Sequence, residues 1–182
     1  MPVQFRRIVT GHDDQGRSIV VDAGPPSKIL QIGGGVTFFE VWNTAASPAP
    51  VMGEFEEPVP ADIVLSPPKN GTRLRVIDFP PVTRDPTPEE ARAAFGAFGG
   101  AHSLDAGGAG KRHPMMHRTE TVDYGIVLAG EITMLMDEGE VVAHAGDIVI
   151  QRGTNHAWVN RSGAPCRIAF ILIDGRFEGG LA

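Results

Sequence analysis

The sequence predicts an all-β protein, built as a β-barrel or a two-sheet jelly roll. From residue 114 onward, short apolar runs alternate with turn signals every eight to ten residues, which is typical of sandwiches and barrels. Glycine (23) and proline (15) are both abundant, which favours strands and turns over a helical bundle. The sequence contains neither internal repeats nor heptads.

The C-terminal part of the chain carries the clearest strand signals. Its predicted strands cover residues 117–129, 131–137, 139–144, 147–152, 156–161 and 166–173. Most of the turns between them contain glycine, which supplies the backbone conformations that tight turns require. We expect residues 112–174 to form the core of one globular domain and residues 175–182 to form a tail.

The N-terminal residues 1–111 are predicted to be a strand-rich and loop-rich extension that packs on the barrel or extends it. β-branched and aromatic runs predict strands at about 5–10, 17–22, 28–32, 36–42 and 72–79. The last run alternates polar and apolar residues, which indicates a strand with one face in water. Residues 44–70 contain six prolines and are predicted to be an extended loop.

One short helix is expected at residues 88–98. Thr87 can cap it, Pro88 suits its first position, and Glu90 completes a capping box. The following residues, 99–112, are rich in glycine and are predicted to be a loop.

Composition excludes several classes of function. The net charge of −6 gives no basic surface for nucleic acid or an anionic membrane. No apolar run reaches the roughly 18 residues that a membrane span needs. The first residues lack the apolar stretch of a signal peptide, and the single cysteine, Cys166, fits a reducing compartment. A cytoplasmic location is therefore expected.

Candidate site residues gather in two segments, 113–130 and 146–160. His117 and Thr119 should share one face of a strand, and Asp123 has the same parity. His156 opens a later strand that can lie beside the first. Two imidazoles and one carboxylate could thus face the barrel interior together.

These segments resemble the two motifs of the cupin superfamily of small β-barrels. The first motif of that superfamily reads His-x-His, followed by Glu and Gly, and its four marked positions fall on His117, Thr119, Asp123 and Gly130. The second motif reads Gly-x-x-His-x-x-x-Asn and falls on Gly153, His156 and Asn160. The resemblance covers about residues 112 to 174. It implies a barrel whose mouth holds a ligand.

The resemblance also implies a divalent metal, iron, zinc, manganese or nickel, bound by His117, Asp123 and His156. Thr119 stands where the superfamily has its second histidine, so three protein ligands remain. Such a set leaves positions open for water and substrate, as a catalytic metal requires. A metal-free barrel is the alternative.

Two functions fit this site. One is a metal-dependent enzyme that decarboxylates, hydrates or isomerises a small organic acid or carbonyl compound, or oxygenates it, with His117, Asp123 and His156 as catalytic residues. The other is a non-catalytic barrel that binds a small molecule. The pocket is predicted to include Thr119, Met116, Trp158, Tyr124 and His113. Because sheet edges are commonly covered by a partner, we also expect a homodimer.

Overall fold

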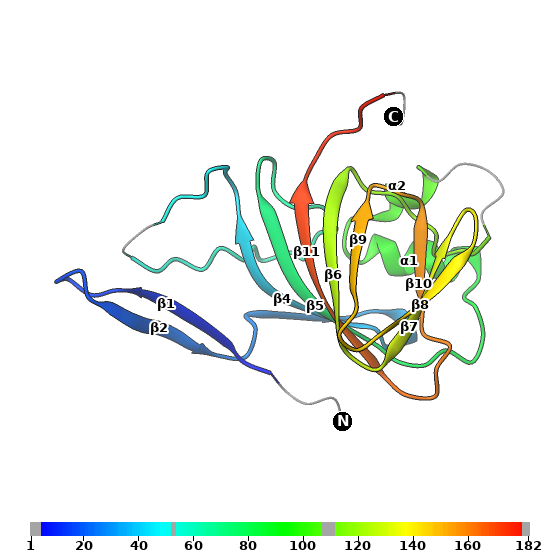
Figure 1. Cartoon of the computed structure of the whole chain (residues 1–182), viewed down its shortest axis with the longest axis horizontal. Coiled ribbons are helices and arrows are strands. Elements are labelled where there is room, and N and C mark those ends of the chain that lie inside the picture. Colours follow the sequence, from blue (N-terminus) through cyan, green and yellow to red (C-terminus); the bar gives the residue numbers. More distant parts are fainter. Residues whose placement is uncertain (1–4, 52–53, 107–111, 180–182) are drawn as a thin grey trace.

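The protein folds into two antiparallel sheets that form a barrel, with a separate hairpin beside them (Figure 1). The computed structural model describes residues 5–51, 54–106 and 112–179. The larger sheet has the order β3 (Lys28–Gln31), β4 (Thr37–Thr44), β5 (Thr72–Phe79), β11 (Cys166–Asp174), β6 (Thr121–Ala129) and β9 (Ile148–Arg152). The smaller sheet has the order β10 (His156–Val159), β7 (Glu131–Met136) and β8 (Glu140–His144). The hairpin pairs β1 (Arg7–His12) with β2 (Ser18–Gly24). The predicted all-β fold is confirmed.

Helical structure is confined to α1 (Pro88–Gly96), α2 (Ala101–Asp105) and a 3-10 turn, η1 (Gly33–Gly35), within the described residues. The predicted capping box is present: the Thr87 hydroxyl accepts from the Glu90 amide, and the Glu90 carboxylate accepts from the Thr87 amide. α2 forms where a loop was predicted, because Leu104 packs into the core. Residues 107–111 of that predicted loop lie outside the described residues. None of the described helices has the length and apolarity needed to cross a membrane.

The N-terminal segment contributes half of the larger sheet. β5 pairs with β11, and β4 and β3 continue the sheet from β5. Phe38 of β4 packs against Phe98, with ring centroids 5.0 Å apart, and Phe95 lies 5.2 Å from Phe98. Phe170 of β11 belongs to the same core cluster. The barrel core therefore joins residues from both halves of the chain.

Arg73 and Arg75 of β5 are buried, which corrects the prediction that one face of this strand lies in water. Arg73 and Arg75 are almost fully buried, and so is Glu40 on the neighbouring β4. The Arg73 Nη1 donates to Glu40 Oε2 at 2.9 Å, and Arg75 Nη2 lies 2.9 Å from Glu40 Oε1. Arg75 also donates to the Val64 carbonyl at 2.6 Å. A sequence alternation fixes two faces but not which one is inside, and the carboxylate of Glu40 makes the polar face compatible with burial.

We predict that Glu40→Ala lowers the free energy of unfolding by about 3–5 kcal/mol, because it leaves two guanidinium groups buried without their anion. Urea denaturation followed by circular dichroism measures this loss. The exposed Arg92–Asp105 pair gives the control, since Asp105→Ala should leave the unfolding midpoint nearly unchanged. Equal effects of the two substitutions would contradict a role for Glu40 in compensating buried charge.

Candidate functional site

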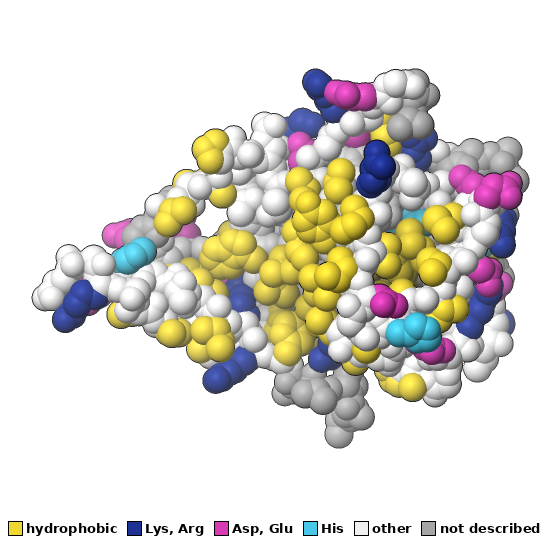
Figure 2. All heavy atoms as spheres, viewed as in Figure 1, with side chains coloured by type: hydrophobic (Ala, Val, Ile, Leu, Met, Phe, Trp, Pro, Cys, Tyr) yellow, Lys and Arg dark blue, Asp and Glu magenta, His cyan; other side chains and the backbone are white. Residues whose placement is uncertain are grey.

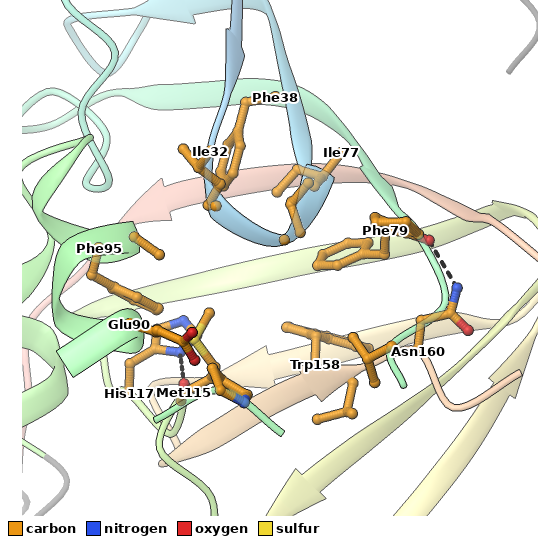
Figure 3. Close-up of a pocket in the computed structure, with 18 of the residues that line it drawn as sticks. Ile32, Phe38, Ile77, Phe79, Glu90, Phe95, Met115, His117, Trp158 and Asn160 are labelled. Carbon is orange, nitrogen blue, oxygen red and sulfur yellow. Dashed lines mark hydrogen bonds between the residues drawn. The ribbon is translucent and has the colours of Figure 1, made fainter. Parts of the chain in front are cut away.

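A cavity of about 620 Å³ lies between the two sheets, next to α1 (Figure 3). Its apolar wall includes Ile32, Phe38, Ile77, Phe79, Phe95, Phe98, Met115, Trp158, Phe170 and Leu172. Its polar lining includes Arg75, His113, His117, Thr119, Asp123 and His156. Cavities of this volume hold small-molecule ligands in other proteins.

His117 and His156 lie side by side in this cavity. Their backbones form an isolated bridge, with His117 N donating to His156 O at 2.9 Å and the reverse bond at 3.0 Å. Their ring centroids are 4.4 Å apart, and the ring centroid of Phe95 lies 4.7 Å from that of His117. β6 was predicted to start at residue 117 but starts at Thr121. The reason is that residue 117 pairs with β10 of the smaller sheet, whereas Thr121 already belongs to the larger sheet.

The hydrogen bonds of the His117 ring define its tautomer, whereas the His156 ring has two neighbours that select different tautomers. The His117 Nδ1 donates to the Met115 carbonyl at 3.0 Å, so Nε2 is the acceptor nitrogen of the neutral ring. The His156 Nδ1 lies 2.9 Å from the Thr154 carbonyl and 2.7 Å from the Gln151 amide nitrogen. The carbonyl can only accept and the amide nitrogen can only donate, so each tautomer of His156 satisfies one of these neighbours.

Burial lowers the pKa of His156 to about 4, although the Thr154 carbonyl acts in the opposite direction. The imidazole is therefore neutral at physiological pH and can accept a proton. Burial raises the pKa of Asp123 to about 6, against smaller opposing effects of a hydrogen bond from Thr121 and the charge of Arg75. Asp123 Oδ1 is buried and has no hydrogen-bond partner among the described residues.

Thr119 lies close to the Asp123 carboxylate, on the far side of Thr121. Its hydroxyl is 2.8 Å from that of Thr121. Because Thr121 donates to the carboxylate of Asp123, it accepts from Thr119 in a short chain of hydroxyl groups. Thr119 is buried and lines the cavity, so this chain connects Asp123 to the cavity wall.

The predicted three-ligand metal centre does not fit these residues as they are placed. The described residues include no group of three or more His, Cys, Asp or Glu side chains that could hold a metal ion. His117 and His156 are in contact, but Asp123 does not join them as a third ligand. The crossing of the chain from one sheet to the other between residues 117 and 121 breaks the regular alternation on which the prediction relied.

The other predicted pocket residues divide into two groups. His113 and Trp158 line the cavity, and the His113 Nε2 lies 3.1 Å from Asp85 Oδ1. Met116 instead packs in a separate core cluster with Leu135, Ala157 and Val159, and the adjacent Met115 lines the cavity. Tyr124 is exposed on the outside of the sheet, because neighbouring residues of a strand face opposite sides and Asp123 faces inward.

Residues of the N-terminal half form part of the site that the sequence did not reveal. Arg75 of β5, Phe38 of β4 and Phe95 of α1 all line the cavity. One signal in the sequence could have revealed them. Glu40 is the single acid in the strand β4, whose other residues are largely aromatic or β-branched, and of the strands only β5 lies between it and His117 in the chain. An acid at that place indicates a buried cation nearby.

The fold is a β-barrel with an internal cavity, and comparisons with known proteins agree on the family. The cupin-domain model matches residues 102–173. The chain is 32% identical to the phomopsin biosynthesis cluster protein C' of Diaporthe leptostromiformis, over 96% of this chain and 85% of that protein. It is 28% identical to the cupin-domain-containing oxidoreductase fogC of Aspergillus ruber, over 92% of this chain and 71% of that protein.

The chain therefore belongs to the cupin superfamily, as the sequence motifs predicted. Among solved structures, the cupin domain of Cnp3 from Schizosaccharomyces pombe matches 94% of this chain and 89% of that chain, with 11% identity and a TM-score of 0.47.

The raised pKa of Asp123 predicts a specific pH dependence of stability. The folded-state pKa of about 6 exceeds the ordinary value of 3.8, so the folded state binds the proton of Asp123 more tightly than the unfolded chain does. The stability gained from this proton is therefore complete below about pH 4 and is lost as the pH rises through 6. Relative to Asp123→Asn, the wild-type free energy of unfolding should fall by on the order of 3 kcal/mol between pH 4 and pH 7. Urea denaturation of both proteins at several pH values measures it, and His156, present in both, cancels in the difference. A difference that stays constant with pH would exclude the shift.

Proposed function

We propose that the protein is a cupin enzyme that catalyses proton transfer on a small, largely apolar, cyclic compound bound in the cavity. The observation that carries this proposal is the placement of the His117–His156 pair and the buried Asp123 on one apolar cavity of about 620 Å³. The aromatic wall around Trp158 favours a planar ring as the bound group.

A reaction explains the polar groups better than simple binding does. A binding pocket is mostly apolar and needs only a few polar groups to orient its ligand. This cavity is lined by four ionisable groups: Arg75, Asp123, His117 and His156. Burying such groups costs free energy unless a partner of opposite charge compensates them or a reaction uses them. The raised pKa of Asp123, about 6, supports the same inference, because a general acid works best when its pKa lies near the operating pH.

Each of these groups has a role in the proposal. The neutral imidazole of His156 removes a proton from a carbon next to a carbonyl group, and His117 lies close enough to share the proton. Asp123, whose pKa of about 6 lies near physiological pH, returns a proton at a second position. Arg75 holds the carbonyl or carboxylate oxygen of the substrate. Isomerisation and the loss or addition of water are reactions of this kind. In a decarboxylation, loss of carbon dioxide replaces the removal of the proton, and Asp123 protonates the carbanion that is left.

A redox reaction is the second candidate, and it is favoured by the names of relatives. Proteins of Aspergillus ruber and Hypocrea virens with 28% and 27% identity are named cupin-domain-containing oxidoreductases. In that case the substrate loses electrons to an acceptor such as dioxygen. Iron, zinc, manganese and nickel, the metals expected from the sequence, belong in the test of this candidate.

Hydrogen–deuterium exchange tests the proposal without knowledge of the final product. A panel of cyclic and aromatic ketones, keto acids and hydroxy acids is incubated with the protein in D₂O, and deuterium on carbon is measured by mass spectrometry. We expect at least one compound to exchange, and we expect His156→Ala and Asp123→Asn to slow that exchange by about 10²- to 10⁴-fold. Tyr124→Phe, which changes an outward side chain next to Asp123, is the matched control and should leave the rate unchanged.

The other outcomes identify the competing functions. Product that forms under air with added metal but not under nitrogen, without exchange, replaces the proposal by the redox reaction. Compounds that bind but show neither exchange nor product under either gas identify a binding protein, and the enzyme proposal is then wrong.

A further inference from the structure

Beside the cavity, the larger sheet is apolar on its outer side and charged on its inner side. Figure 2 shows hydrophobic side chains gathered over the outer side, where Val122 and Ile148 are exposed. The inner side carries Arg75 and Asp123, which are both buried and both line the cavity. The charge that a bound ligand meets is therefore set by a few interior groups rather than by the surface of the molecule.

Acidic side chains outnumber arginines in the lining of the cavity. The acids are Asp85, Glu90 and Asp123, and the arginines are Arg75 and Arg84. Asp123, with a pKa of about 6, is largely ionised at neutral pH. Burial lowers the pKa of His156 to about 4, so this imidazole adds no positive charge. An anionic ligand would therefore enter a site that already has an excess of negative charge.

The charge of Arg75, which is 1% exposed, is already compensated. Its Nη2 donates to the Val64 carbonyl at 2.6 Å and lies 2.9 Å from Glu40 Oε1. Its Nε is buried and has no hydrogen-bond partner among the described residues. Arginine binds a carboxylate best through two parallel N–H groups, and here Nη2 is occupied. A single N–H donor matches the single oxygen of a carbonyl group.

The second lining arginine, Arg84, is also occupied. It donates to both carboxylate oxygens of Glu90, at 2.8 Å and 2.6 Å. Glu90 in turn accepts from the Thr87 amide, so this ion pair is part of the cap of α1. A ligand carboxylate would have to displace Glu90 from Arg84. Both described arginines of the lining thus already face a carboxylate of the protein.

We propose that the cavity selects neutral ring compounds with a carbonyl group over the corresponding carboxylates, and that Glu40 sets this preference. Burying a carboxylate without a cation of its own costs far more free energy than burying a neutral carbonyl oxygen. Glu40 is 0% exposed, so it acts by compensating Arg75 and not by contact with the ligand. The inference rests on the proposed function, because it names the substrate class of the same site.

Equilibrium dialysis with two matched probes, 2-acetylnaphthalene and 2-naphthoate, tests this selectivity at about pH 7.5, where Asp123 is ionised. The probes share their ring and differ only in a methyl group that replaces one carboxylate oxygen. We expect the wild type to bind the ketone at least about 30-fold more tightly than the carboxylate, because a buried charge without a free partner weakens binding on that order.

Two variants reverse the charge balance. Glu40→Gln keeps the shape of the side chain and leaves Arg75 without its anion, so the ratio of the two affinities should move towards the carboxylate by at least about 10-fold. Asp123→Asn removes an acid that lines the cavity and should move the ratio in the same direction. Circular dichroism shows whether each variant is folded, and Asp123→Asn decides the matter if Glu40→Gln does not fold.

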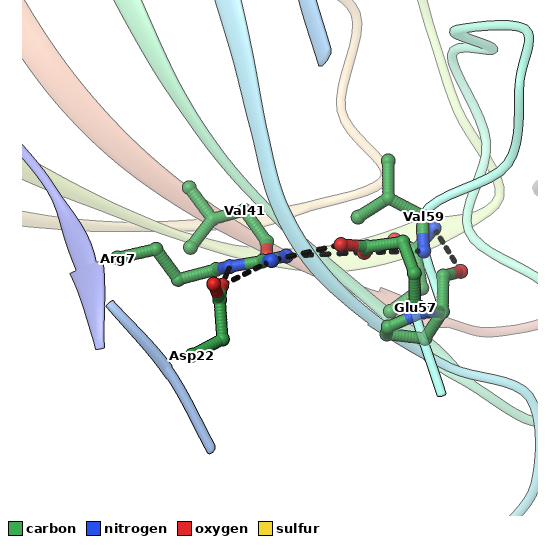
Figure 4. A network of polar contacts seen from close by, with 7 residues as sticks. Arg7, Asp22, Val41, Glu57 and Val59 are labelled. Atoms are coloured by element: carbon green, nitrogen blue, oxygen red, sulfur yellow. Dashed lines mark hydrogen bonds and ion pairs between the residues drawn. The ribbon is translucent and has the colours of Figure 1, made fainter. Parts of the chain in front are cut away.

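Arg7 supplies the matched control, because it is a buried arginine of the same kind that does not line the cavity (Figure 4). It is 7% exposed and donates to Asp22 at 2.6 Å and to Glu57 at 2.8 Å. Glu57→Gln therefore removes a carboxylate from a buried arginine, as Glu40→Gln does. The ratio of the two affinities should nevertheless stay within about 2-fold of the wild type, because distant sites act independently.

A wild type that binds neither probe, or that binds 2-naphthoate as tightly as 2-acetylnaphthalene, would overturn the proposal. So would an unchanged ratio in Asp123→Asn or in folded Glu40→Gln, or an equal change in Glu57→Gln. The proton transfer is judged separately by deuterium exchange. Exchange into keto acids but into no neutral ketone refutes the neutral class and leaves the proton transfer standing. Selective binding of the ketone without exchange in any compound refutes the proton transfer and leaves the selectivity standing.

Discussion

The burial of charge inside the barrel is the constraint on which the rest of this structure depends. Arg73 and Arg75 of β5 face the interior, where Glu40 of β4 compensates them, and Arg75 and Asp123 of β6 act on each other's pKa values. Burial lowers the pKa of Arg75 to about 10, so the guanidinium still keeps its charge at neutral pH. These residues come from both halves of the chain. Segment 112–174 alone therefore lacks Arg75, the buried cation that acts on its Asp123.

This constraint gives the larger sheet an unusual distribution of polarity. Its inner side carries Arg75 and Asp123, whereas its outer side carries Tyr124 and Ile150. The aromatic walls of the cavity leave room for a ligand beside Arg75 and Asp123. The candidate active site therefore lies on the inner side of these strands. His156 joins the site from the smaller sheet, which places it opposite that polar side.

The alternation of residues in the sequence was sufficient for the all-β class and for most strand positions, such as β7 at Glu131–Met136 against a predicted 131–137. It could not assign an inner face to β5, because the compensating Glu40 lies thirty-three residues before Arg73. The alternation also placed Met116 in the pocket, whereas Met115 lines the cavity. It predicted one regular strand from His117 through Asp123, whereas β6 begins at Thr121. A crossing between sheets is a tertiary event, and the cross-strand pairing of His117 with His156 that causes it leaves no local signal.

The central claim is that substrate occupies the cavity beside His156, and fluorescence of Trp158 tests it most directly. The chain has two tryptophans, and Trp42 stacks on Phe55, whereas Trp158 lines the cavity with its ring 6.0 Å from that of His156. In a Trp42→Phe variant, Trp158 is the only indole. A compound that undergoes exchange or turnover should change its emission in a saturable way, with a midpoint that matches the concentration dependence of the reaction. Saturable turnover with unchanged Trp158 emission would place the reaction outside the cavity and contradict this account.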